Sequence, residues 1–265
     1  MASSKEQEEE ETMKVQEFGT ENRETIVLLH GGGLSWWNYR KEAELLQAEY
    51  HVVLPILDGH ADSDRPFTSI EDNAAEIIEY IDRHCQGHVL LIGGLSLGAL
   101  VLVEILSRRA DICQYAVVES ASLISSKLTH ALIGPTFGSS YGLVRKKWFA
   151  KLQFRSLRMR EDLFDDYYAD TSKISKEDMI AFLKANTAYE LKPEIRNTQA
   201  KVRIAVGGKE QKKMLRSAEI LHERLTGSRL EKMDGLYHGE YSINQPEQYV
   251  KDILETVREE RKARL

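Results

Sequence analysis

The sequence predicts an α/β fold: a doubly wound, mostly parallel sheet with a helical lid insertion. Short and continuously apolar runs alternate with segments of helical period, which is the pattern of strands covered on both faces by helices. Residues 122–197 interrupt this alternation, because they contain no convincing strand signal. A third observation is a G-x-S-x-G motif between one predicted strand and the helix that follows it.

Composition excludes several classes of protein. The chain has 265 residues, of which 42% are hydrophobic and 29% charged, so it is too apolar for a disordered chain and too charged for a membrane-embedded one. The formal net charge of −6 predicts no nucleic-acid partner and no anionic membrane partner. Cys85 and Cys113 are too few for a disulfide framework and fit no metal spacing, so we expect a cytoplasmic protein without a metal site. We also expect no cofactor, and a monomer or homodimer.

Two segments could be mistaken for targeting or membrane signals. Residues 1–12 are rich in glutamate and lack the apolar stretch of a signal peptide, so we expect a disordered acidic tail. The apolar run Val89–Val103 is shorter than a membrane span and is interrupted by glycine and serine. It therefore predicts a buried strand, a tight turn and a buried helix.

Strands are predicted where branched residues form short apolar runs between turn signals. The predicted strands are Thr25–His30, His51–Ile56, Val89–Gly93, Tyr115–Glu119, Lys201–Val206 and Arg229–Met233.

Helices are predicted between these strands. In Ile70–His84 the apolar residues recur at helical spacing, and Thr68 with Glu71 has the spacing of a capping box. Met214–Leu225 and Val250–Val257 show the same periodicity.

The strandless segment divides the chain. Residues 13–121 and 198–265 are predicted to form the core, and residues 122–197 a helical lid inserted over the carboxyl ends of the strands, where open α/β sheets bind ligands. Ordinary crossover helices are the alternative. Aromatic residues of the insertion, including Trp148 and Phe149, suggest an apolar pocket.

The motif Gly94-Leu95-Ser96-Leu97-Gly98 is the strongest chemical signal in the chain. A sharp strand-to-helix turn would raise the Ser96 hydroxyl above the sheet edge and point the Leu97 N–H at an incoming carbonyl. A tight turn with a capping serine is the alternative reading.

His30-Gly31-Gly32-Gly33 follows the first strong strand. Glycine lets the backbone approach a ligand, so the N–H of Gly32 or Gly33 is a candidate second donor to an oxyanion. A nucleotide-phosphate loop is the alternative, but neither G-x-G-x-x-G nor the lysine-bearing phosphate loop is present.

A serine nucleophile needs a base. His238 lies in a glycine-flanked loop after the strand Arg229–Met233 and is the best candidate. His60 also follows a strand, but it precedes Ser96 in the chain, and we expect it to have a structural or site-wall role. His130 and His222 have the spacing of helical surface residues.

The base in turn needs an orienting carboxylate. Glu210 follows the strand Lys201–Val206 and gives the order Ser96, Glu210, His238 along the chain. Glu119 closes the preceding strand and is the alternative acid. Two further carboxylates, Asp234 and Glu240, are too close to the histidine along a tight loop.

These motifs together resemble the α/β-hydrolase family, in particular its small lidded serine hydrolases of the carboxylesterase type. The resemblance implies an α/β-hydrolase fold with an eight-stranded sheet from about Met13 onward. Residues 57–64 are similar to the family's Pro-Gly-His-Gly-x-Ser loop, although Asp58 and Ala61 replace its proline and second glycine. A glutamate at position 210 also departs from the commoner aspartate.

The site residues predict a serine hydrolase that cleaves a small acyl ester or thioester through a Ser-His-Glu triad and an acyl-enzyme. A cofactor-free lyase, of the C–C or hydroxynitrile type, could use the same triad as a proton shuttle. A non-catalytic ligand-binding protein on this scaffold is the third reading, and the fold alone does not choose among the three.

Overall fold

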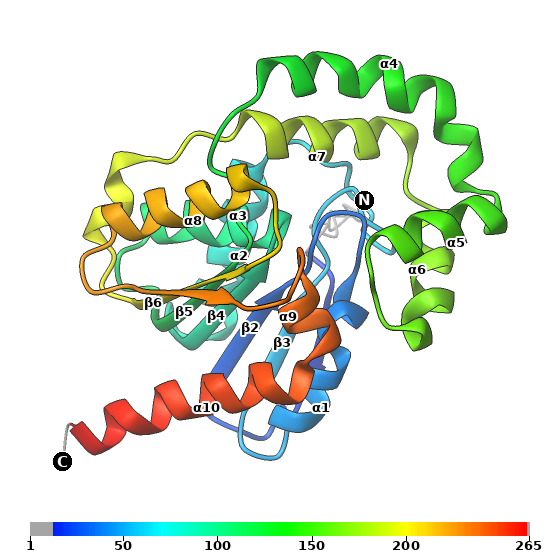
Figure 1. The fold of residues 1–265 in the computed structure, drawn as a ribbon. Coiled ribbons are helices and arrows are strands. Elements are labelled where there is room, and N and C mark those ends of the chain that lie inside the picture. Colours follow the sequence, from blue (N-terminus) through cyan, green and yellow to red (C-terminus); the bar gives the residue numbers. More distant parts are fainter. Residues whose placement is uncertain (1–12, 264–265) are drawn as a thin grey trace, which may run out of the picture.

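The computed structural model describes residues 13–263, with the side chains of residues 138–140 and 259–263 left out of the description. The predicted acidic tail, residues 1–12, lies outside the described residues. The described chain forms a seven-stranded sheet with the order β1-β3-β2-β4-β5-β6-β7, in which only β1 is antiparallel to its neighbour (Figure 1). The strands are β1 (Val15–Phe18), β2 (Thr25–Leu29), β3 (His51–Pro55), β4 (Val89–Leu95), β5 (Cys113–Glu119), β6 (Lys201–Gly207) and β7 (Arg229–Met233).

The doubly wound, mostly parallel sheet is confirmed, and the six predicted strands are observed with ends that differ by at most two residues. Every residue of the central strands β2 and β4 is buried, as continuous apolar runs predict. The edge strand β1 has too few apolar residues to be found by this criterion. The number of strands implied by the family resemblance is wrong for the described residues, which form seven strands rather than eight.

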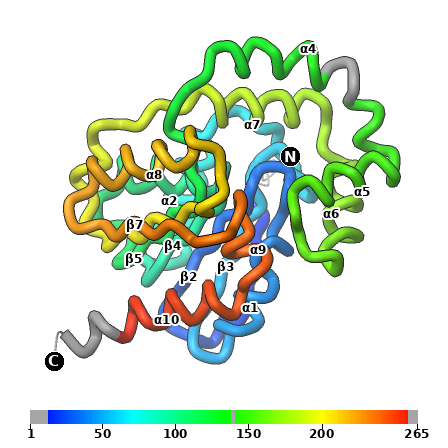
Figure 2. Tube along the Cα trace, viewed as in Figure 1, coloured from blue at the N-terminus to red at the C-terminus, as the bar shows by residue number. Residues whose placement is uncertain are grey.

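Helices cover both faces of the sheet (Figures 1 and 2). One face packs against α2 (Ile70–His84), α3 (Leu97–Arg108) and α8 (Lys212–Arg224), and the other against α1 (Arg40–Leu46) and α10 (Pro246–Ala263). Each face therefore has its own hydrophobic core. Helix α2 has its predicted bounds, but its cap lies one residue later than predicted, at Ser69 rather than Thr68, because the Ser69 hydroxyl accepts the Asp72 N–H.

Between β5 and β6 the chain is helical. The helices are α4 (Lys127–Val144), α5 (Lys147–Ser156), α6 (Phe164–Thr171) and α7 (Lys176–Ala188), with the short turns η2 (Glu161–Leu163) and η3 (Pro193–Asn197). Helix α4 packs along α7, and α5 packs along α6 (Figure 1). We call residues 122–197 the helical insertion.

The insertion is tied to the chain that follows β2. The Trp37 indole N–H donates to Asp170 at 2.8 Å, and the Arg40 guanidinium makes two hydrogen bonds to Asp166, at 3.0 and 3.1 Å. Trp37 belongs to the short turn η1 (Trp36–Tyr39). These contacts hold α6 against the loop at the carboxyl end of β2. Within residues 13–263, no helix has the length and apolar character needed to cross a membrane.

The turn from β4 into α3 depends on close backbone contacts. A Cβ on Gly98 would overlap the carbonyl oxygens of Leu29 and His30, and a Cβ on Gly94 would overlap the Gly98 carbonyl. Both positions therefore require glycine if α3 is to pack this closely on the end of β2.

We expect Gly98→Ala to lower the free energy of unfolding by about 3 kcal/mol, because the new methyl group must displace the backbone of β2. Chemical denaturation measures the effect. Gly142→Ala in α4 is the matched control, since a Cβ there meets nothing within 4 Å, and it should leave stability unchanged or raise it by about 0.5–1 kcal/mol. Equal stability of both variants would contradict the packing argument.

Candidate active site

The predicted site residues meet at the carboxyl edge of the sheet. Ser96 follows β4, Glu119 ends β5, Glu210 follows β6, and His238 follows β7. Because carboxyl ends of neighbouring parallel strands lie side by side, residues far apart in sequence come together there. The loop His30–Gly33 follows β2 and borders the same place.

Ser96 occupies the sharp turn predicted from its motif. Its backbone has φ 54° and ψ −106°, a conformation that L residues rarely adopt. The Ser96 N–H donates to the Glu119 carbonyl at 2.9 Å, which fixes the turn to the end of β5. Helix α3 begins at Leu97, so the Ser96 side chain lies at the positive end of a buried helix.

His238 lies between Ser96 and Glu210. Its Nδ1 is 2.7 Å from Glu210 Oε2, and its Nε2 is 3.0 Å from Ser96 Oγ. A carboxylate can only accept, so Nδ1–H donates to Glu210, and Nε2 is left to accept the serine proton. The structure thus brings together the three residues in the order that a nucleophile, a base and an orienting acid require.

Glu210 is held as an anion. Its Oε1 accepts from the Ser120 hydroxyl at 2.6 Å and from the Gly207 N–H at 2.9 Å, in addition to the bond from His238. Burial of Glu210 raises its pKa, but the hydrogen bonds from His238, Ser120 and Gly207 outweigh it, so the pKa lies below its ordinary value. Ser120 was not identified from the sequence as a partner of Glu210, although its place directly after β5 was the available signal.

Glu119, the alternative acid, takes a different position. Its side chain is buried, and its Oε1 accepts the Ser242 N–H at 3.3 Å, while its Oε2 has no hydrogen-bond partner among the described residues. Burial raises the pKa of Glu119 to about 7. Glu119 therefore links β5 to α9 (Glu240–Asn244), the helix that follows the histidine loop. His238 donates to Glu210 and not to Glu119.

The two candidate oxyanion donors of the glycine loop differ. The Gly33 N–H is already engaged, because it donates to His60 Nε2 at 3.0 Å. The N–H groups of Gly32 and Leu97 have no hydrogen-bond partner among residues 13–263. Gly32 lies next to Leu97, since a Cβ built on Gly32 would be 3.5 Å from the Leu97 Cβ.

His60 is buried behind the glycine loop, which it supports, and it does not line the pocket beside Ser96. Its Nδ1–H donates to the Asp58 carbonyl at 3.0 Å, its Nε2 accepts from Gly33, and its ring stacks on Phe182 of α7 with centroids 4.8 Å apart. Burial lowers the pKa of His60 to about 4, so the ring is neutral at neutral pH. Both ring nitrogens are occupied, which leaves His60 no means of acting as a base.

The remaining candidates lie elsewhere. His130 contacts Thr187 and His222 contacts Ser228, each through Nδ1. Glu240 accepts the Tyr237 N–H at 2.7 Å and so stabilises its own loop, as its closeness to His238 along the chain suggested.

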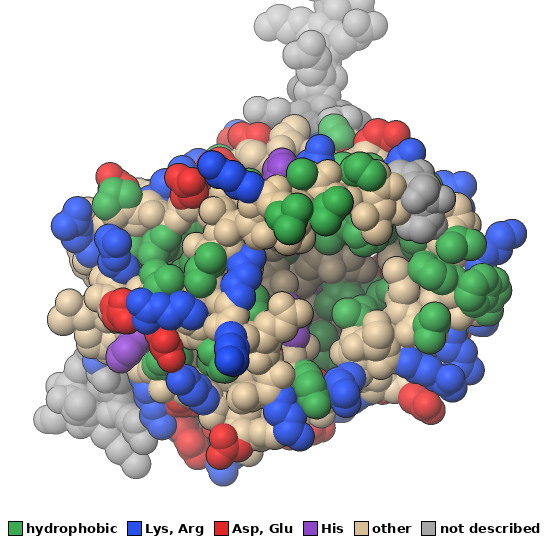
Figure 3. Space-filling model, turned by 45° about the horizontal axis from the view of Figure 1, so that its top comes forward, with side chains coloured by type: hydrophobic (Ala, Val, Ile, Leu, Met, Phe, Trp, Pro, Cys, Tyr) green, Lys and Arg blue, Asp and Glu red, His purple; other side chains and the backbone are tan. Residues whose placement is uncertain are grey.

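A small apolar pocket of about 130 Å³ opens beside the Ser96 hydroxyl. Its side-chain walls are Leu34, Leu95, Leu157, Met159 and Ile243. Trp148 was expected to line an apolar pocket, but its side chain is 64% exposed on α5 and does not border this one. The space-filling view shows the hollow on the face that the insertion partly covers (Figure 3).

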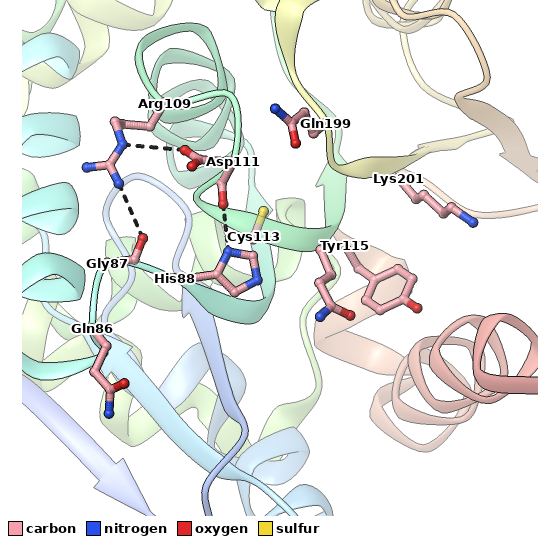
Figure 4. Close-up of a pocket in the computed structure, with 10 residues that line it drawn as sticks. Gln86, Gly87, His88, Arg109, Asp111, Cys113, Tyr115, Gln199 and Lys201 are labelled. Carbon is pink, nitrogen blue, oxygen red and sulfur yellow. Dashed lines mark hydrogen bonds and ion pairs between the residues drawn. The ribbon is translucent and has the colours of Figure 1, made fainter. Parts of the chain in front are cut away.

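A second hollow, of about 520 Å³, lies at the opposite edge of the sheet, near the amino ends of β4–β6 (Figure 4). Its Arg and His side chains already have partners, since Arg109 contacts Asp111 and the Gly87 carbonyl, and His88 contacts the Asp111 carbonyl. The Cys113 thiol is buried there, and burial raises its pKa to about 12. This hollow offers no activated nucleophile. The described part of the chain holds no group of three or more His, Cys, Asp or Glu side chains that could bind a metal ion.

Comparisons with known proteins identify the family and the fold of the chain. Residues 26–251 match the family model described as the alpha/beta hydrolase family. A comparison with curated protein sequences found no match. Among solved structures, an esterase from Exiguobacterium antarcticum is similar, with a TM-score of 0.78, 19% identity, and coverage of 93% of this chain and 95% of that one.

Two further structures have the same fold. A thermophilic esterase from Thermogutta terrifontis has a TM-score of 0.76 and 15% identity, with 93% of each chain covered. The enol-lactonase from Burkholderia xenovorans LB400 has a TM-score of 0.75 and 17% identity, covering 92% of this chain and 96% of that one. At these identities the likeness concerns the fold.

The raised pKa of Glu119 predicts a dependence of stability on pH. Between the ordinary value of 4.5 and about 7, the unfolded chain loses a proton that the folded protein keeps, so folding loses stability as the pH rises. Glu119→Gln removes this loss. Relative to the unaltered protein, the variant should gain at most about 3 kcal/mol between pH 4.5 and pH 8, measured by urea denaturation. A stability difference that stays constant with pH would contradict a buried proton on Glu119.

Proposed function

Since this chain belongs to the alpha/beta hydrolase family, we propose that it is a serine hydrolase that cleaves a small acyl ester or thioester through an acyl-enzyme. The observation that carries the proposal is the hydrogen-bonded series from Ser96 through His238 to Glu210, with distances of 3.0 and 2.7 Å. A serine hydroxyl is a weak nucleophile unless an oriented base accepts its proton.

In the proposed mechanism, Ser96 Oγ attacks the substrate carbonyl as its proton passes to His238 Nε2. Glu210 keeps the imidazole in the required tautomer and stabilises the imidazolium, because it stays ionised when His238 gains the proton. His238 then returns the proton to the leaving group. Water attacks the acyl-enzyme by the same route and regenerates Ser96.

The negative charge that develops on the carbonyl oxygen needs preorganised donors. The N–H groups of Leu97 and Gly32 are the proposed pair, one at the start of α3 and one in the glycine loop. Each donor of this kind lowers the barrier by about 3–4 kcal/mol in well-studied enzymes. The hydrogen bond between Gly33 and His60 would hold the glycine loop in place while Gly32 donates.

The proposed acyl group is small, because the pocket beside Ser96 has room for only a few carbon atoms. Leu157 and Met159 close that pocket from the insertion, which supports a role of the insertion as a lid that sets substrate range. The chemistry itself would come from the core residues.

A panel of p-nitrophenyl esters graded by acyl length tests the proposal. Turnover of the shortest esters, abolished by Ser96→Ala in a folded variant, is the expected result. Silence across the whole panel would overturn the proposal of a hydrolase, whereas turnover that survives in Ser96→Ala would mean that another group is the nucleophile.

The two carboxylates are separated by matched substitutions. Glu210→Gln keeps the shape of the side chain but removes the charge that orients His238, so kcat should fall by about 10⁴-fold. Glu119→Gln should keep most of the activity, because Glu119 does not contact His238 through a hydrogen bond. Steady-state kinetics on a short ester measures both, and the reverse ranking would move the orienting role to Glu119.

Pocket size should control acyl preference. Met159→Ala removes most of a buried side chain from the pocket wall, so kcat/KM for a hexanoyl ester relative to an acetyl ester should rise about tenfold. Trp148→Ala, which alters an exposed residue away from the pocket, is the control and should leave the ratio unchanged. An unchanged ratio in Met159→Ala would show that the acyl group binds elsewhere.

A further inference from the structure

The charge of the chain is unevenly distributed. Residues 143–160, which run from the end of α4 through α5 to η2, contain seven Lys or Arg residues and no Asp or Glu, although the whole chain has a net charge of −6. The seven are Arg145, Lys146, Lys147, Lys151, Arg155, Arg158 and Arg160. The negative net charge of the whole chain therefore conceals a strongly basic segment.

Large apolar side chains are exposed on the same segment. Trp148 is 64% exposed and Leu152 60%, and they lie one helical turn apart on α5. Leu143 and Leu157, at the two ends of the segment, are 39% and 45% exposed. In the space-filling view, hydrophobic and basic side chains gather over α5, on the face that carries the hollow (Figure 3).

The helical positions sort these residues into stripes. Lys147, Lys151 and Arg155 follow one another at intervals of four and form a basic stripe, beside which Trp148 and Leu152 form an apolar one. Ala150 and Phe154 lie on the buried side and attach α5 to the protein. We call the exposed residues 143–158 of this segment the basic–apolar surface.

Most of the basic side chains are not neutralised by neighbours. Among the described residues, Lys146, Lys151 and Arg155 make no ion pair. Lys147 lies 3.8 Å from the exposed Asp165, a weak surface contact, and Arg158 packs over the Tyr237 ring at 3.9 Å. The surface thus presents uncompensated positive charge together with aromatic and aliphatic groups.

We propose that the basic–apolar surface binds an anionic lipid bilayer peripherally. Lys and Arg would contact acidic headgroups, while Trp148 and Leu152 would enter the boundary between headgroups and acyl chains. The phosphate backbone of duplex nucleic acid would match the charge, but it offers no apolar environment for the exposed Leu side chains.

The surface leads to the candidate active site. Leu157 is both an exposed member of the surface and a wall of the pocket beside Ser96. A protein docked by α5 would therefore bring the mouth of that pocket next to the bilayer. This consequence rests on the proposed function and would favour acyl substrates that partition into lipid, whereas the binding itself does not depend on catalysis.

Co-sedimentation of the full chain with vesicles tests the proposal. Vesicles of phosphatidylcholine alone are compared with vesicles containing about 30% phosphatidylglycerol, at low and high salt. Binding to the anionic vesicles that weakens as salt rises is the expected result. Absence of binding at low salt, or equal binding to both compositions, would overturn the proposal.

Two variants divide the contribution of charge from that of apolar contact. Lys146→Gln/Lys151→Gln/Arg155→Gln should weaken binding about 100-fold, since each cation near an anionic surface contributes about fivefold. Trp148→Ser/Leu152→Ser should weaken it about tenfold. Full binding by this second variant would indicate a purely electrostatic contact and overturn insertion at the interface.

The control variant removes three cations from α8 instead: Lys212→Gln/Lys213→Gln/Arg224→Gln. It should bind as the unaltered protein does, and an equal loss would reduce the effect to net charge and contradict the proposal. Hydrolysis of a soluble short ester by Trp148→Ser/Leu152→Ser should be unchanged. If the unaltered protein hydrolyses the ester but does not bind vesicles, only the docking surface is refuted. Ser96→Ala should still bind vesicles, because binding does not depend on catalysis.

Discussion

The close approach of α3 to the end of β2 is the constraint on which the site depends. Gly98 lies against the carbonyl oxygens of Leu29 and His30, so the helix can start directly after β4. The intervening Ser96 is then forced to φ 54°, which lifts its hydroxyl from the sheet. The same contact sets the Leu97 N–H beside the glycine loop, and a single steric requirement thereby positions both the proposed nucleophile and the proposed oxyanion donors.

Two buried glutamates a short distance apart illustrate how surroundings assign roles. Glu210 receives three hydrogen bonds and has a pKa below its ordinary value, whereas Glu119 receives one long bond from Ser242 and has its pKa raised to about 7 by burial. An anion suits the orientation of a histidine, and a proton-bearing acid suits an apolar interior. Donor count, rather than position at a strand end, separates the two.

Sequence reasoning predicted the parallel sheet and most of its strands, because continuous apolar runs are visible without coordinates. It also selected Ser96, His238 and Glu210, since each follows a strand and the carboxyl ends of parallel strands converge. It could not separate Gly32 from Gly33, because the hydrogen bond from Gly33 to His60 joins loops distant in sequence. The pocket wall at Met159 was missed for a similar reason, as helical periodicity does not reveal which residue turns toward the site.

The central claim is that Ser96 is activated by His238 and reacts covalently. Labelling with a fluorophosphonate, followed by intact-mass and peptide mass spectrometry, tests it most directly. The account predicts one adduct per chain, located on Ser96 and absent from a folded Ser96→Ala protein. An adduct on another residue, or no adduct on a correctly folded protein, would contradict it.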